Sequence, residues 1–142
     1  MKKTMKRVVP MLLLVAVLFS IAVPAGAEAS SYFISSGVTI TAKGGGNLQI
    51  SLSAQATDVM KSLGASYVAI KEKQSNGTYC TVKTYTKATR PSLVQNNRAS
   101  FRTFFYYQGK AGKTYQVFVT FRAENASGVG TITQTSRNVV AS

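Results

Sequence analysis

The chain has 142 residues, of which 17 are lysine or arginine and four are aspartate or glutamate, with one cysteine and no histidine. The lack of histidine removes the usual general base, triad member and zinc ligand. One cysteine can form neither an internal disulfide nor a thiolate metal site, and four scattered acids do not suggest a pair of facing catalytic carboxylates. We therefore expect a protein that is not an enzyme and holds no cofactor or metal.

The first 27 residues have the pattern of a secretory signal peptide. Residues 1–7 contain four basic residues and no acid, residues 11–23 are apolar apart from one serine, and small residues follow. This order is typical of signal peptides, and the apolar segment is shorter than the roughly 18–20 residues of a membrane anchor. We expect cleavage after Ala27, with Ala29 as the alternative. Residues 28–142 then form a single domain without a transmembrane segment.

The basic head and the AGA-EA junction resemble the signal peptides of Gram-positive bacteria. The resemblance implies a secreted protein that is extracellular or loosely associated with the cell wall. Cleavage after Ala27 would leave 13 basic residues against four acids, a net charge of about +9. Such an imbalance attracts polyanions, although charge of this kind also serves ordinary solubility.

Short runs that alternate apolar and polar residues recur along the chain, separated by turn residues. Alternation with a period of two predicts half-buried strands, and Asn76–Gly77 predicts a tight hairpin. The expected strands span residues 32–42, 48–56, 66–73, 79–85, 99–107, 115–123 and 131–140. Residues 58–63 are expected to form one helical turn, capped by Asp58 and ended by Gly64. This pattern predicts an all-β fold, a seven-stranded antiparallel β-sandwich.

The segment GKAGKT, residues 109–114, ends like a nucleotide-binding P-loop. A P-loop needs a glycine five residues before its final Gly-Lys-Thr, where this chain has Tyr107, and it must open a helix that faces the phosphates. The residues that follow alternate with a period of two instead. We therefore expect a turn that leads into a strand.

The stretch from Gly112 to Val119 is similar to the approach to strand F of a fibronectin type III domain, and residues 124–130 resemble the loop before its last strand. The resemblance implies a fibronectin type III or immunoglobulin-like sandwich in which Tyr115 is a corner tyrosine and Gly112 permits the bend. The chain departs from that family in having no tryptophan. The whole mature chain also resembles small secreted proteins of Firmicutes that form an uncharacterised family.

Cys80 alternates with Val82 in the expected strand at 79–85. This position predicts a small, buried, apolar side chain. A reactive thiol and an intermolecular disulfide are the alternatives.

Basic and aromatic residues are expected to share one outer face of the sandwich. Nine basic residues and no acid lie between Glu72 and Glu124. If Val68 and Ile70 face the core, the opposite side of their sheet carries the candidate binding residues, which are Tyr67, Lys71, Lys73, Phe118 and Arg122. The second sheet offers another outward set, which is Arg102, Phe104 and Tyr106. Such surfaces can stack on sugars or bases and hold phosphates, or the aromatic rings can cover one another.

Three functions are compatible with these features. The first is a secreted binding or adhesion module that associates with anionic cell-wall polymers, glycans or an anionic lipid surface. The second is a cationic antimicrobial or bacteriocin-like protein, and the third is a structural protein of the envelope. No motif supports specific nucleic-acid recognition.

Overall fold

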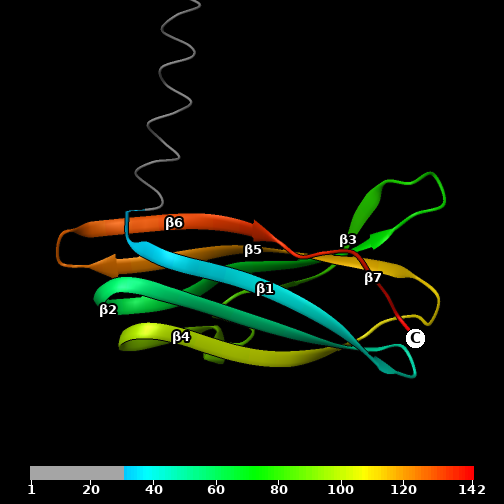
Figure 1. Ribbon diagram of the computed structural model, residues 1–142, viewed down its shortest axis with the longest axis horizontal. Helices are drawn as coiled ribbons and strands as arrows, with labels where there is room; N and C mark the ends of the chain where they lie inside the picture. Colours follow the sequence, from blue (N-terminus) through cyan, green and yellow to red (C-terminus); the bar gives the residue numbers. More distant parts are fainter. Residues whose placement is uncertain (1–30) are drawn as a thin grey trace, which may run out of the picture.

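A computed structural model describes residues 31–142, and strands make up most of this part of the chain (Figure 1). The expected signal peptide and its cleavage at Ala27 or Ala29 lie outside the described residues. The strands are β1 (Phe33–Gly44), β2 (Asn47–Lys73), β3 (Tyr79–Tyr85), β4 (Val94–Gln108), β5 (Thr114–Asn125), β6 (Gly128–Thr135) and β7 (Val139–Val140). All of their pairings are antiparallel, which confirms the expected all-β sandwich.

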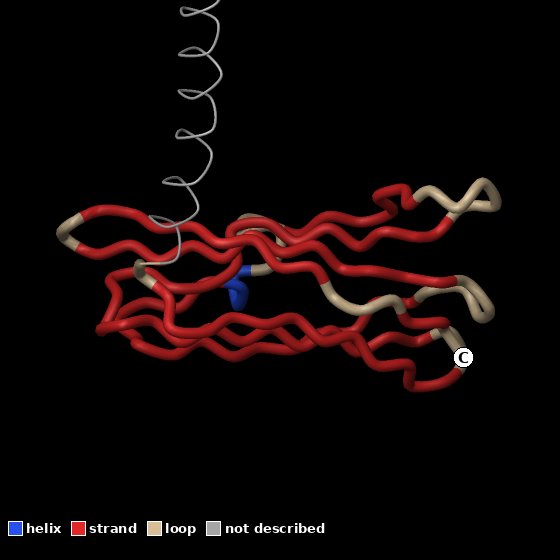
Figure 2. Tube along the Cα trace, turned by 45° about the horizontal axis from the view of Figure 1, so that its top comes forward, coloured by secondary structure: helices blue, strands red, loops and turns tan. Residues whose placement is uncertain are grey.

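The longest strand, β2, belongs to both layers of the sandwich. Its first half pairs with β1 and β4. Residues 60–64 pair with β4 and also reach β5, and the residues after them pair with β5 and β3. A register shift between Gln55 and Met60 separates the two halves. The β4 layer therefore contains β1, the first half of β2, and β4, whereas the β5 layer contains β3, the second half of β2, β5 and β6 (Figure 2). The short β7 completes the β5 layer by pairing with the start of β5.

The expected helical turn at residues 58–63 is wrong, because these residues continue β2. Met60 and Leu63 are both fully buried, and their spacing of three residues imitates a helical repeat. The Asp58 carboxylate accepts a hydrogen bond from the next N–H along the chain (2.7 Å), whereas a helix cap bonds an N–H two or three residues further on. Among residues 31–142, the structure has one short 3-10 turn, and it lies at Pro91–Leu93.

The core lies between the two layers and follows the expected alternation. In the β5 layer, the inward side chains of Val68, Ile70, Val117, Val119 and Phe121 are fully buried. From the β4 layer, the buried side chains include Leu48, Ile50, Leu52, Phe101 and Phe105. Burial of each such side chain contributes about 1.5–3 kcal/mol, so the core can stabilise the domain without a disulfide.

Cys80 is exposed, and the expectation of a buried side chain is wrong. It lies on β3, whose hairpin with β2 projects away from the rest of the sandwich (Figure 1). Alternation predicts burial only where a second layer covers the strand. At this edge nothing in the described chain covers the thiol.

Gly64 of β2 lies tightly against the backbone of Leu93 and Val94, where β4 begins. A Cβ atom there would overlap the Leu93 carbonyl oxygen and lie 2.8 Å from the Val94 Cα. We predict that Gly64→Ala lowers the free energy of unfolding by about 1–3 kcal/mol, because a backbone neighbour must move to relieve the overlap. Urea denaturation of the purified protein measures the change.

Gly37→Ala is the matched control for this prediction. Gly37 also lies in a strand, but a Cβ there would be 3.7 Å from the Ser53 Oγ, an ordinary contact. Its unfolding free energy should stay within about 0.5 kcal/mol of wild type. Equal effects of the two substitutions would contradict the steric explanation.

Candidate functional site

The outer face of the β5 layer brings together three of the five candidate binding residues. The rings of Tyr67 on β2 and Phe118 on β5 meet edge to face, with centroids 6.4 Å apart. The Lys71 Nζ lies 5.2 Å from the Phe118 ring centroid, within the range of a cation–π interaction. These side chains cover Ala69, which is 1% exposed although it points outward. The three residues, called the Tyr67 cluster below, therefore both protect the sheet and present a mixed aromatic and cationic surface.

Lys73 and Arg122 lie on the same face at opposite ends of the Tyr67 cluster. Lys73 is exposed beside the β2–β3 hairpin. Lys71 pairs with Gln116 of β5, and Arg122 lies six residues further along that strand, opposite Gly64. The distance from Lys71 to Arg122 along the face is therefore roughly 20 Å. The Arg122 Nη2 is 3.4 Å from the Glu124 Oε2, and both side chains are partly exposed. The five residues thus form a row along the face rather than one pocket.

A hollow of about 500 Å³ lies at the Arg122 end of this row. It is lined by Lys61, Ser62, Lys87, Asn96, Asn97, Arg122 and Glu124. Three of these residues are cationic and one is acidic. Sequence analysis missed Lys61, because it fell in the expected helical turn, and Lys87, because it lies in a loop without a periodic pattern. The only sequence feature that included Lys87 was the set of nine basic residues between Glu72 and Glu124.

The backbone of Asn97, in the same hollow, has a φ of 56°. This left-handed conformation is uncommon for a residue with a side chain, although asparagine tolerates it better than most. Asn97 lies near the register shift of β2, where the pairing with β4 resumes between Met60 and Arg98. The bend between the layers therefore shapes the wall of the hollow.

The outer face of the β4 layer carries the second predicted set. Phe104 is 58% exposed and Tyr106 is 50% exposed, and their rings meet edge to face with centroids 6.1 Å apart. Arg102 is also exposed on this face, opposite Ser53 of β2. The opposite side of the strand points inward as expected, with Phe101 and Phe105 buried. These two outward rings are therefore accessible to a partner, unlike rings that pack into the core.

Tyr115 connects the turn before β5 with the interior. Its hydroxyl accepts a hydrogen bond from the Lys110 N–H (2.8 Å) and donates one to the Glu72 Oε2 (3.0 Å). Tyr115 is fully buried and Glu72 is 8% exposed. Gly112 has a φ of 85°, a conformation that favours glycine, so the GKAGKT segment forms a turn into a strand rather than a phosphate loop. This hydroxyl therefore joins backbone and carboxylate at one buried point.

Burial raises the pKa of three tyrosines above the ordinary value of about 10. For Tyr115, burial is the largest cause; the bond from Lys110 opposes it, and the Glu72 carboxylate adds to it. Burial is also the largest cause of the raised pKa of Tyr85 and of Tyr107.

The Arg90 guanidinium lies over the rings of Tyr85 and Phe105, at 5.3 and 4.7 Å from their centroids. Arg90 is therefore a structural cation at the edge between β3 and β4, not part of an open basic surface.

No protein-family model and no curated protein matches this sequence. Within residues 31–142, no group of histidine, cysteine, aspartate or glutamate side chains is placed to hold a metal ion. In the same residues, no helix has the length and apolar character needed to cross a bilayer.

Tyr115→Phe tests the buried hydroxyl. We predict that it lowers the free energy of unfolding by about 1–3 kcal/mol, because both the Lys110 N–H and the Glu72 carboxylate lose a partner. Urea denaturation at pH 7 measures the effect. Tyr106→Phe removes an exposed hydroxyl and should change stability by no more than about 0.5 kcal/mol. A loss no larger than this control would show that the hydroxyl is dispensable.

The stabilising effect of the Tyr115 hydroxyl should also depend on pH. Since the pKa of Tyr115 is raised in the folded protein, its contribution is fully present below the unfolded value of about 10 and is lost as pH rises through the folded value. We expect the stability difference between wild type and Tyr115→Phe to be constant up to about pH 9 and to narrow above pH 10. Denaturation curves recorded from about pH 8 to about pH 11 test this, and a difference that grows with pH would contradict it.

Proposed function

We propose that this protein is a secreted, non-catalytic binding module that associates with a linear phosphate-bearing polymer of the cell envelope. The observation that carries the proposal is a row of cations and aromatic rings on the outer face of the β5 layer. The row runs from Lys73, through the Tyr67 cluster, to the hollow at Arg122. A protein of this charge draws such polymers towards itself from solution.

The hollow supplies the strongest anion-binding chemistry on this face. Lys61 and Lys87 line it together with Arg122, and Glu124 is the one acid among its lining residues. The Arg122–Glu124 contact is long, at 3.4 Å, and its two side chains are 39% and 28% exposed, so a phosphate can compete with the carboxylate for the guanidinium. Amide groups of Asn96 and Asn97 add neutral hydrogen-bond donors at the same place.

The length of the row favours a polymer over a small anion. Roughly 20 Å separate Lys71 from Arg122, which is enough for several repeat units of a linear chain. Between them, Tyr67 is 37% exposed and offers an aromatic surface to the apolar faces of glycerol or sugar units. The row thus has cations at both ends and rings between them, which suits a polymer whose phosphates are separated by carbon units.

The proposed setting is outside a Gram-positive cell, in solution or loosely held at the wall. The support for secretion is the signal-peptide pattern of residues 1–27. We also propose a relationship to fibronectin type III and immunoglobulin-like sandwiches. Its support is the sequence resemblance around Gly112, the two antiparallel layers, and the hydrogen bond from the Lys110 N–H to the Tyr115 hydroxyl.

Cosedimentation with purified Gram-positive cell walls tests the proposal. Wild type should bind at about 0.05 M salt and be released near 0.5 M salt, because counterion release weakens contacts with phosphates. Walls stripped of teichoic acid should retain far less protein. The triple variant Lys61→Gln, Lys87→Gln and Arg122→Gln should bind at least about tenfold more weakly, because three phosphate contacts are removed.

A variant of equal net charge separates a site from general attraction. Lys43, Lys110 and Lys113 are exposed near the turns at the opposite end of the sandwich, so their replacement by glutamine should weaken binding by less than about threefold. Equal losses in the two triple variants would sink the proposed site. Leakage of dye from anionic vesicles, without wall binding, would favour an antimicrobial role instead.

A further inference from the structure

The outer face of the β4 layer has a different chemistry from the row on the β5 layer. Its outward positions on β1 and β2 are mostly small or medium neutral polar residues, which are Ser35, Thr39, Thr41, Gln49, Ser51, Ser53 and Gln55. Register pairs such as Thr39 with Ser51 place these side chains in rows across the two strands. Such a surface offers hydroxyl and amide groups and little charge.

Many of these polar groups are not used by the protein itself. Within residues 31–142, no hydrogen bond engages the side chains of Gln49, Ser51 or Ser53. Hydroxyls and amides each provide both donors and acceptors. The face can therefore exchange its bonds to water for bonds to the hydroxyl groups of a ligand.

The exposed ring pair lies directly beside these polar rows. In the register of β2 with β4, Phe104 is opposite Ser51 and Tyr106 is opposite Gln49. Both rings are at least half exposed, which is an unusual exposure for two large apolar side chains in contact. Because the core does not need them, their role lies at the surface.

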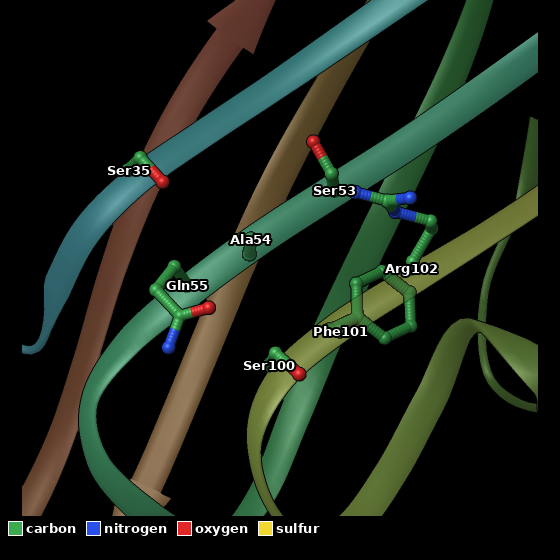
Figure 3. A pocket seen from close by; sticks show the side chains of 7 residues that line it. All are labelled: Ser35, Ser53, Ala54, Gln55, Ser100, Phe101 and Arg102. Carbon is green, nitrogen blue, oxygen red and sulfur yellow. The ribbon is translucent and has the colours of Figure 1, made fainter.

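A hollow of about 320 Å³, shown in Figure 3, is lined by Arg102, which lies two residues before Phe104 in β4. Ser35, Ser53, Gln55, Ser100 and Arg102 line it from three strands, over the buried Ala54 and Phe101. Figure 3 shows the Arg102 guanidinium beside Ser53, the residue opposite it in the register of β2 with β4. The hollow thus joins one cation to several hydroxyl groups, within reach of an aromatic pair.

We propose that this face binds a polysaccharide chain, independently of the phosphate-polymer site on the β5 layer. Sugar rings would stack on Phe104 and Tyr106, because the apolar faces of a sugar fit an aromatic ring. Sugar hydroxyl groups bond the polar rows of β2, and the hollow receives the next unit of the chain. Arg102 donates to sugar oxygens and favours units that carry a carboxylate.

The composition of the face disfavours the other partners. A protein interface is depleted in serine, and its centre is more apolar than two rings in a field of hydroxyls. A nucleic acid or an anionic membrane needs many cations, and the hollow and ring pair offer only Arg102. A chain of hydroxyl groups matches the face without leaving charge or large apolar area unpaired.

Calorimetric titration of the full chain at about 0.5 M salt tests this, because that salt suppresses charge-driven binding at the β5 layer. The probes are hydroxyethylcellulose and xylan, which are essentially neutral, and polygalacturonate, which carries carboxylates. Wild type should bind at least one of them. The double variant Phe104→Ala and Tyr106→Ala should bind at least about tenfold more weakly, because both stacking surfaces are lost.

Two further variants isolate the roles of the rings and the cation. Phe104→Tyr with Tyr106→Phe keeps both rings and should bind within about threefold of wild type. Arg102→Gln should weaken binding to polygalacturonate at least about fivefold while leaving hydroxyethylcellulose nearly unchanged, when both are measured at about 0.1 M salt in a protein that also carries Lys61→Gln, Lys87→Gln and Arg122→Gln.

Three results would overturn the proposal. They are no binding of wild type to any of the three polysaccharides, equal binding by the double alanine variant, and a change in oligomeric mass caused by that variant in light scattering. The last would make the face a contact between copies of this chain. None of these results depends on wall binding by Lys61, Lys87 and Arg122, so the two sites can fail separately.

Discussion

The fold depends on one continuous strand that belongs to both layers. β2 pairs with β1 and β4 before its bend, with β4 and β5 directly after it, and with β5 and β3 towards its end. Because one stretch of backbone connects the layers, their relative position is set by the bend between Gln55 and Met60 and by the fit of Gly64 against Leu93. This constraint also brings the start of β4 beside the end of β5 and so forms the hollow at Arg122.

The two outer faces of the sandwich have separate chemistry for a simple reason. Alternation along each strand turns one set of residues to the core and leaves the other free to carry function. On the β5 layer the outward side chains are cationic and aromatic, and some of them cover Ala69. On the β4 layer they are hydroxyl-rich, with two rings exposed. The two proposed binding sites therefore lie on different faces of the sandwich.

Local pattern predicts some of these features well and others poorly. The inward and outward sides of residues 66–73, 99–107 and 115–123 follow from a period of two, and the structure confirms their buried positions. Lys61 and Lys87 could not be assigned to a site, because only the return of β4 to β2 brings them near Arg122. β4 begins at Val94, ahead of the expected strand at 99–107, for the same reason, since pairing with β2 as far as Gly64 extends the strand.

The sequence by itself determined the all-β class, the turn at GKAGKT, which side chains of each strand point to the core, and the excess of positive charge. Each of these depends on neighbours a few residues apart or on composition, which a single chain displays directly. Only the tertiary structure decided that residues 58–63 are extended, that Cys80 is exposed and that three cations share one hollow. Those outcomes depend on which strands pair and on where one layer no longer covers the other. Both are decided by contacts between residues far apart in the chain.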